Sequence, residues 1–334
     1  EADMTFVEDE VRPDGGVVGD GDVYLLAYDA DNDLTHFRYG HQELDIRAAE
    51  RPFEAEGRSF PAGSWIVTGD EGAPVRPLME HSAQEHGFTW VGTDDVPDVP
   101  THPVVAPRLA VMHTWLTTQS EGWARVALDE YGVPYDYIST HDVRADPELR
   151  ESYDVILVGP STGDALRIVR GVEGDEPVAW MATEATPNLG RQDATEDMRG
   201  GLGLEGVLNL QRFVEGGGVL ITLTSSSALP VHFGLAGDVR IVERDDLWAP
   251  GGVFRVEKKD EEHPLAYGYG DEVGVHFDSG PIFATGGGGF RFFRGSGGGG
   301  EDAGGPGSTT ARHTGRGGYD ETDIVQGRAR DMGE

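Results

Sequence analysis

Short apolar runs alternate with amphipathic stretches between residues 109 and 223, and this alternation restricts the fold more than any other feature of the chain. Predicted helices over residues 121–131 and 204–215 lie between four runs of strand length, at residues 109–112, 135–139, 155–158 and 219–223. Strands that are apolar on both faces are typical of a parallel sheet covered by helices on both sides. The sequence therefore predicts an α/β fold with a doubly wound parallel sheet over residues 108–285.

The composition changes on either side of this predicted domain. We expect residues 1–20 to form an acidic tether and residues 21–93 to form a small α/β connector region, in which one helix ends at Gly87. Four prolines predict a stiff linker over residues 94–107. Residues 286–334 are so rich in glycine that they bury too little apolar area to offset the entropy of ordering, and we expect a disordered tail.

Charge and cysteine content exclude several classes of function. The chain carries 60 acidic and 26 basic side chains, with a formal net charge of −34, so a phosphate backbone or an anionic membrane surface would be repelled. We therefore expect neither nucleic acid nor membrane as a partner. The absence of cysteine rules out disulfides, zinc–thiolate sites and cysteine nucleophiles. The chain starts at Glu1 without a signal segment, and we expect its true N-terminus to be missing.

Candidate site residues follow the predicted strands. In an open parallel sheet, ligands bind beyond the carboxyl ends of the strands, so the loops that leave those ends should cluster at one edge. These loops and the helix start beside them supply the candidate binding residues: His113, Trp115, Glu121, Ser139, His141, Asp142 and Ser225.

Two interpretations of the serines in these loops are open. Ser225 with His113 or His141 would supply the residue types of a serine-type hydrolase, which needs a base within hydrogen-bonding reach of the nucleophile. The chain has no Gly-x-Ser-x-Gly elbow, however. The interpretation we favour is that residues 225–227 cap the helix that follows the strand.

Metal binding and small-molecule binding are further alternatives. His113 and His141 could share a zinc ion, although backbone hydrogen bonds are the more common role of loop histidines. His81 and His86 lie five residues apart on a predicted helix, so they point to different faces and are poor joint ligands. Trp115 and Trp123, with Asp142, could line a carbohydrate or other small-molecule site, but core packing is the more common role of tryptophan.

Several phrases of the sequence, taken as a set, resemble the C-terminal half of large bacterial zinc carboxypeptidases, the carboxypeptidase A-like metallopeptidases. They are RLAVMHTWLTTQSEGW from Arg108, RGGLGLEGVLNL from Arg199, FVEGGGVLITLTSSSALP from Phe213, LWAPG, AYGYGD and TGRGGYDETDIVQGR. In that family a peptidase domain precedes a class I glutamine amidotransferase-like domain, which is flavodoxin-like in fold. Residues 21–94 resemble the region that connects the two.

This resemblance implies a secreted or periplasmic protein and zinc-dependent removal of C-terminal residues by a peptidase domain that this chain lacks. Zinc is expected only in that missing domain, because the chain has no His-x-x-Glu motif, and we expect no cofactor here. The amidotransferase-like fold implies a cysteine nucleophile where residues 224–226 stand, and no cysteine is present. From the resemblance we expect the family's last strands to be missing after Arg328, so that the chain is a fragment.

The function expected from these observations is that of a non-catalytic accessory portion of a secreted metallocarboxypeptidase-like protein. Its partners would be its own peptidase domain or a peptide substrate. A carbohydrate or other small-molecule binding module, and a serine-type hydrolase at the strand tips, are the alternatives.

Overall fold

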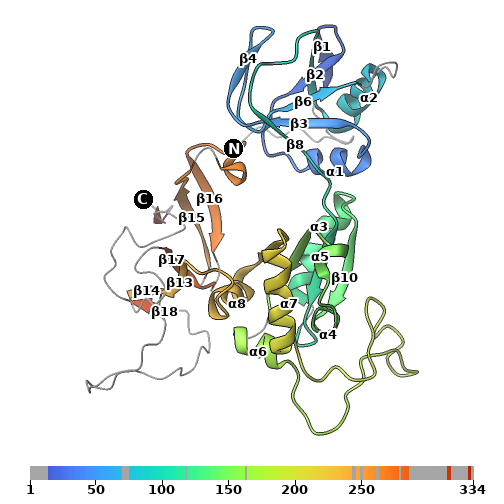
Figure 1. Cartoon of the computed structure of the whole chain (residues 1–334), viewed down its shortest axis with the longest axis vertical. Coiled ribbons are helices and arrows are strands. Elements are labelled where there is room, and N and C mark those ends of the chain that lie inside the picture. The colour runs from blue at the N-terminus through green and yellow to red at the C-terminus, as the bar shows by residue number, and fades with distance from the viewer. Residues whose placement is uncertain are drawn as a thin grey trace, which may run out of the picture. The chain divides into compact units, whose positions relative to one another are not determined.

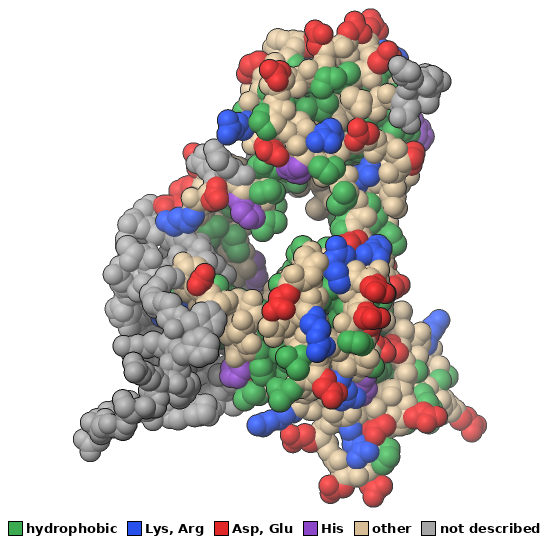
Figure 2. Space-filling view, viewed as in Figure 1, with side chains coloured by type: hydrophobic (Ala, Val, Ile, Leu, Met, Phe, Trp, Pro, Cys, Tyr) green, Lys and Arg blue, Asp and Glu red, His purple; other side chains and the backbone are tan. Residues whose placement is uncertain are grey.

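The computed structural model describes residues 14–69, 75–117, 119–161, 164–242, 246–248, 251–260, 263–277, 280–285, 314–316 and 330–331. The chain divides into two compact units. Unit 1 comprises residues 1–106, 131–133 and 258–271, and unit 2 comprises residues 107–130, 134–257 and 272–334. The division after Ala106 falls at the end of the proline-rich segment. Figure 2 shows acidic side chains spread over the face that it draws, with basic side chains scattered among them.

Unit 1 is built on a six-stranded mixed sheet with the strand order β1-β7-β2-β6-β3-β8. Only β1 and β7 run parallel, and the other neighbours are antiparallel. The strands are β1 (Gly16–Val18), β2 (Val23–Leu26), β3 (Asp45–Ala49), β6 (Trp65–Thr68), β7 (Thr89–Thr93) and β8 (Thr101–Pro103), with a separate hairpin of β4 (Phe53–Ala55) and β5 (Arg58–Phe60).

Two helices cover one face of this sheet, α1 (Asp33–Gly40) and α2 (Arg76–His86). Phe37 of α1 and Met79 of α2 are fully buried with Trp65 and Trp90 in one core. The predicted helix end is confirmed, since Gly87 caps α2 with a φ of 76° that glycine adopts without strain.

Two segments expected to be irregular contribute strands to this sheet. Gly16–Val18 lies within the expected tether and pairs with β7, and Thr101–Pro103 lies within the expected linker and pairs with β3. Proline is tolerated in the second case because β8 is an edge strand, where a missing N–H breaks no ladder. Residues 1–13 and nearly all of the expected glycine-rich tail lie outside the described residues.

Unit 2 contains a sheet of four parallel strands in the order β10-β9-β11-β12. This confirms the α/β class with an all-parallel sheet at the position that the apolar runs predict. The strands are β9 (Leu109–His113), β10 (Tyr135–Ser139), β11 (Val155–Val158) and β12 (Val219–Thr222). The helices around them are α3 (Gln119–Glu130), α4 (Thr140–Ala145), α5 (Leu149–Ser152), α6 (Ala165–Arg170), α7 (Gly203–Glu215), the short 3₁₀ helix η1 (Thr224–Ser227) and α8 (Ala228–His232).

The main core of unit 2 lies on one face of the parallel sheet. Ala110, Met112 and Ile156 point into it and meet Leu210 and Phe213 of α7. The opposite face is covered less completely: on the edge strand β12, Val219 is 53 % exposed and Ile221 is 41 % exposed. Helix α3 contributes Glu121 as its buried residue. The two faces of the sheet are therefore buried to different extents, and the less covered face has room for a polar site.

The remaining described residues form small antiparallel pairs. They are β13 (Val239–Val242) with β17 (Ile282–Thr285), β14 (Asp246–Trp248) with β18 (Thr314–Arg316), and β15 (Gly252–Glu257) with β16 (Glu272–Phe277) and β19 (Arg330–Asp331). A short 3₁₀ helix, η2, spans Pro264–Ala266. Within the part of the chain that the structure describes, no helix has the length and apolar character needed to cross a membrane.

Candidate functional site

His113, the last residue of β9, and Tyr137, in the middle of the adjacent strand β10, form the floor of the candidate site. Alternate residues of a strand share a face, and both side chains lie on the less covered face of the sheet. The two rings stack with their centroids 4.3 Å apart and an interplanar angle of 15°. The indole ring of Trp115 meets the imidazole of His113 edge-on, at 4.7 Å. His113 is 2 % exposed, so its environment is fixed by the protein.

A buried charge on α3 lies against the same floor. Glu121 is 2 % exposed, and its carboxylate accepts hydrogen bonds from Arg125 Nε at 2.9 Å and from the Tyr137 hydroxyl at 2.7 Å. The guanidinium of Arg125 also lies over the Tyr137 ring, 4.5 Å from its centroid. A buried carboxylate is tolerated only when it is paired in this way. Burial, and then the hydrogen bond to Glu121, raise the pKa of Tyr137.

Gly159 explains how α3 comes so close to the sheet. This residue follows β11, and a Cβ atom placed there would lie 2.3 Å from the Cβ of Glu121. Any larger residue would therefore push the start of α3 away from the strand end. Gly159 is thus needed for Glu121 to lie against the end of β11.

A long excursion between α6 and α7, residues 171–202, supplies the wall of the site. It carries no helix or regular strand and is the yellow-green trace that leaves α6 and returns to α7 in Figure 1. Backbone hydrogen bonds pair Trp180 with Thr195, and the Arg199 side chain donates to both Asp197 and the Gly174 carbonyl. The hydrogen bond from Arg199 lowers the pKa of Asp197. These contacts give the excursion a defined course.

Asp193 joins this excursion to the sheet. One of its carboxylate oxygens lies 2.8 Å from Nε2 of His113, and the imidazole is nearly inaccessible to solvent. With Nε2–H donating to the carboxylate, neutral His113 keeps Nδ1 as a hydrogen-bond acceptor. The pair thus fixes both the ring and the loop.

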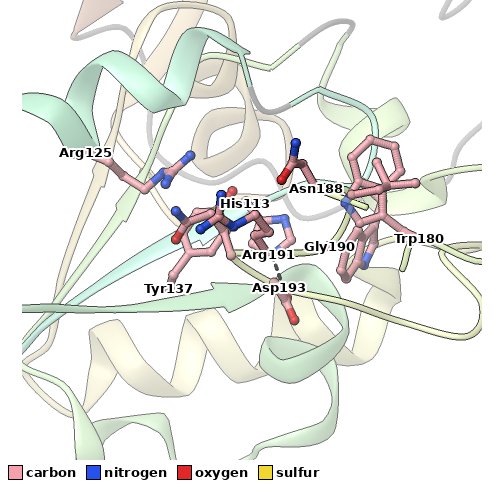
Figure 3. A pocket seen from close by; sticks show the side chains of 11 residues that line it. His113, Arg125, Tyr137, Trp180, Asn188, Gly190, Arg191 and Asp193 are labelled. Atoms are coloured by element: carbon pink, nitrogen blue, oxygen red, sulfur yellow. Dashed lines mark hydrogen bonds and ion pairs between the residues drawn. The ribbon is translucent and has the colours of Figure 1, made fainter. Parts of the chain in front are cut away.

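A pocket of about 150 Å³ lies between the floor and the excursion (Figure 3). Its lining includes the three aromatic side chains Trp115, Tyr137 and Trp180 and the polar side chains His113, Arg125, Asn188, Arg191, Gln192 and Asp193. The volume is smaller than that of pockets for drug-sized molecules, which start near ~300 Å³. A ligand here would have the size of a monosaccharide or an amino acid.

Three neighbouring residues at this edge carry buried polar atoms that have no hydrogen-bond partner among the described residues. They are Nδ1 of His113, Oγ1 of Thr114 and Nε1 of Trp115. Buried polar groups are normally paired, and an unpaired one costs free energy.

The structure gives Ser139 and Asp142 a local role. Ser139 Oγ accepts from the Asp142 backbone N–H at 3.2 Å, and the Ser139 backbone N–H donates to the Asp142 carboxylate at 2.8 Å. This reciprocal pair is a capping box at the start of α4. Neither residue lines the pocket.

Ser225 is likewise engaged with backbone. Its hydroxyl donates to the Ser161 carbonyl at 2.6 Å and accepts from the Ser161 N–H at 3.1 Å. Ser226 donates to the Val158 and Leu223 carbonyls. Ser225 therefore contacts the loop after β11 rather than the helix, and Ser227, the N-cap residue of α8, makes no side-chain capping hydrogen bond, so the capping interpretation does not hold for these two residues. No hydrogen bond links Ser225 to His113 or His141 within the described part of the chain.

Thr224 stands at the turn between β12 and η1 with a φ of 49°. A β-branched residue is strained in this left-handed conformation. A strained turn between a parallel strand and a helix is the geometry of a nucleophile elbow. The Thr224 side chain is exposed and stands at that position.

His141 and Trp123 lie outside the pocket. His141 Nε2 lies 3.4 Å from the Gly200 carbonyl, and its ring lies 5.9 Å from that of Trp115. Among the described residues, His113 and His141 do not belong to a group of three potential ligands close enough to share an ion. Trp123 is 75 % exposed on α3, so it neither packs in the core, as we expected, nor lines the pocket.

Apart from His113 and Trp115, the sequence did not reveal the residues that line the pocket: Arg125 and Tyr137 on α3 and β10, and Trp180 and Asp193 with residues 188–192 of the excursion. The only signal for the excursion was the length of the segment between α6 and α7, because loops of that length in compact domains are often functional. The strand-end rule found His113 and Trp115, and the helix start found Glu121. Comparison of the chain with protein-family models, with curated proteins and with solved structures finds no match.

Proposed function

We propose that unit 2 is a non-catalytic module that binds a small neutral polyhydroxylated ligand of monosaccharide size. The observation that carries this proposal is the pocket of about 150 Å³ in which aromatic rings and planar polar side chains converge on the edge of the parallel sheet. Aromatic faces suit the apolar C–H face of a sugar ring, and amide and carboxylate groups suit its hydroxyls.

Charge favours a neutral ligand. The net charge of −34 repels anions at long range, while a neutral sugar approaches unopposed. The guanidinium of Arg125 is already paired with Glu121, so it offers little to an anionic ligand. Asn188, Gln192 and Asp193 supply both donors and acceptors, which vicinal hydroxyls require.

The arrangement of hydroxyls supports a binding role over a hydrolytic one. Ser225 and Ser139 are used in local hydrogen bonds, and the residue at the elbow is Thr224. A nucleophile needs a base within hydrogen-bonding reach. Among the described residues, the Ser225 hydroxyl is bonded to Ser161, and no hydrogen bond joins it to His113 or His141.

We also propose a fold type for unit 2 and a role for the chain beside a peptidase domain. The order β10-β9-β11-β12 is 2-1-3-4 in chain order, which supports a doubly wound, flavodoxin-like domain of the amidotransferase type. The resemblance supports an accessory role beside a secreted or periplasmic zinc carboxypeptidase domain, with that domain or its peptide as a partner. A His-x-x-Glu motif encoded upstream of Glu1 would support this role, and an unrelated upstream sequence would contradict it.

Binding can be tested by isothermal titration of the full chain with glucose, galactose and mannose. We expect one site, and we expect Trp180→Ala to weaken binding about tenfold, or ~1.4 kcal/mol, because the excursion loses its stacking surface. Trp123→Ala is the matched control, since this tryptophan is exposed on α3 away from the pocket.

Two results would contradict the proposal. One is that none of the three sugars binds. The other is that Trp123→Ala weakens binding as much as Trp180→Ala does. Consumption of the sugar during the titration would contradict the non-catalytic part alone.

A further inference from the structure

Two histidines and a glutamate meet in unit 1, far along the chain from the pocket residues. His36 lies on α1, and Glu85 and His86 are the last two residues of α2. One potential ligand atom from each lies within 4.8 Å of the other two. The fold brings them together because α1 and α2 pack on the same face of the six-stranded sheet, through Phe37 and Met79.

The ring nitrogens of both histidines are arranged as in metal-binding sites. Nδ1 of His36 lies 3.1 Å from the Tyr131 carbonyl, which belongs to the same unit, and Nδ1 of His86 lies 3.4 Å from an Asp33 carboxylate oxygen. An N–H at Nδ1 that donates to an oxygen leaves Nε2 as the free lone pair. Metal-ligating histidines use this orientation, in which the outer partner fixes the tautomer.

The rings are also held in place by their neighbours. The imidazoles of His36 and His86 lie 5.3 Å apart, and His86 stacks on Phe88 at 5.0 Å with an interplanar angle of 30°. The side chain of His86 is only 9 % exposed, whereas that of Glu85 is 50 % exposed and its carboxylate also lies 3.4 Å from Nε2 of the exposed His81. Nε2 of His86 is already 3.8 Å from a carboxylate oxygen of Glu85.

We infer that His36, Glu85 and His86 form a site for a divalent ion of the zinc class, with Asp33 and the Tyr131 carbonyl orienting the two rings. Ligand atoms around tetrahedral zinc lie about 3.3 Å apart, so rotation of the exposed Glu85 side chain is the adjustment required. Two imidazoles and one carboxylate leave a fourth position for water or another ligand.

This inference departs from our sequence-based expectation that the chain binds no metal. The separation of His81 from His86 holds, because His81 is not part of the cluster and is 71 % exposed. His36 replaces it as the partner of His86. The inference concerns unit 1 and does not depend on sugar binding by unit 2.

The test is a titration of the full, chelator-treated chain with ZnCl₂ in excess MgCl₂, followed by calorimetry. Cobalt absorption in the visible region serves as a second readout. We expect one zinc equivalent and a tetrahedral cobalt spectrum. Glu85→Gln, on an exposed side chain, should weaken zinc binding at least tenfold, and Asp33→Ala should weaken it by about 10–100-fold, because Nδ1 of His86 loses the oxygen that orients the ring.

His276→Asn is the matched control, since it changes an exposed histidine on β16 of unit 2, outside the cluster, and should bind zinc like the unaltered chain. Excess magnesium saturates sites made of carboxylates alone. The zinc binding that remains therefore reports a site with imidazole ligands. The inference is overturned if no stoichiometric zinc site exists. It is equally overturned if Glu85→Gln and His36→Asn titrate like His276→Asn while circular dichroism shows all three variants folded.

Discussion

At the scale of single residues, Asp154 organises the beginning of the parallel sheet. Its carboxylate accepts from the backbone N–H and the guanidinium of Arg108, at 2.9–3.0 Å, and from Arg150 at 2.6 Å. Its own carbonyl accepts from the Val219 N–H. One side chain and its backbone therefore tie together the starts of β9, β11 and β12.

The Arg108 side chain and backbone hold the pKa of Asp154 well below its usual range. A depressed folded-state pKa adds stability above the unfolded-state pKa of about 3.9, and this stability is lost as the pH falls through the folded-state value. We predict that the free energy of unfolding falls between about pH 5 and pH 2, and that Asp154→Asn removes part of this slope. Urea denaturation at a series of pH values measures the free energy of unfolding of the unaltered chain and of Asp154→Asn. An unchanged slope in Asp154→Asn would argue against the network.

At the scale of elements, the strand ends combine helix capping with site building. The capping box of Ser139 and Asp142 starts α4, and Ser226 satisfies backbone groups at the start of η1. In contrast, His113 at the end of β9 and Tyr137 in the middle of β10 line the pocket. The same edge of the sheet thus serves two purposes through different side chains.

Ser139→Ala tests this division. The loss of an N-cap hydroxyl should lower the free energy of unfolding by about 1 kcal/mol, because a backbone N–H of α4 loses its acceptor. Sugar binding should not change, since Ser139 does not line the pocket. The two measurements are denaturant unfolding and sugar titration. A loss of binding at unchanged stability would assign Ser139 to the site instead.

The apolar runs predicted the parallel strands because burial on a covered sheet demands such runs, as at residues 109–112 and 155–158. The rule that loops after parallel strands cluster found His113 and Trp115. It could not find Asp193 or Trp180, since a segment without periodicity gives no indication of which side chain turns back to the sheet. It also could not separate a capping Ser139 from a binding one, because both roles use the same residue type at a strand end.

At the scale of the whole molecule, the two units present two different chemistries. Unit 1 buries its aromatic side chains in a sheet core and gathers histidines between α1 and α2. Unit 2 places its polar cluster on the less covered face of a parallel sheet, under an excursion held by Asp193 and Arg199. A strongly acidic surface suits neutral or cationic ligands in both.

Indole N–H resonances of the full chain, recorded by heteronuclear NMR while glucose, galactose or mannose is added, test the binding site most directly. We predict that the signals of Trp115 and Trp180 shift with a common saturation curve. Those of Trp65 and Trp90, buried in the core of unit 1, should stay in place. Stationary Trp115 and Trp180 signals, or equal shifts of all four, would contradict the account.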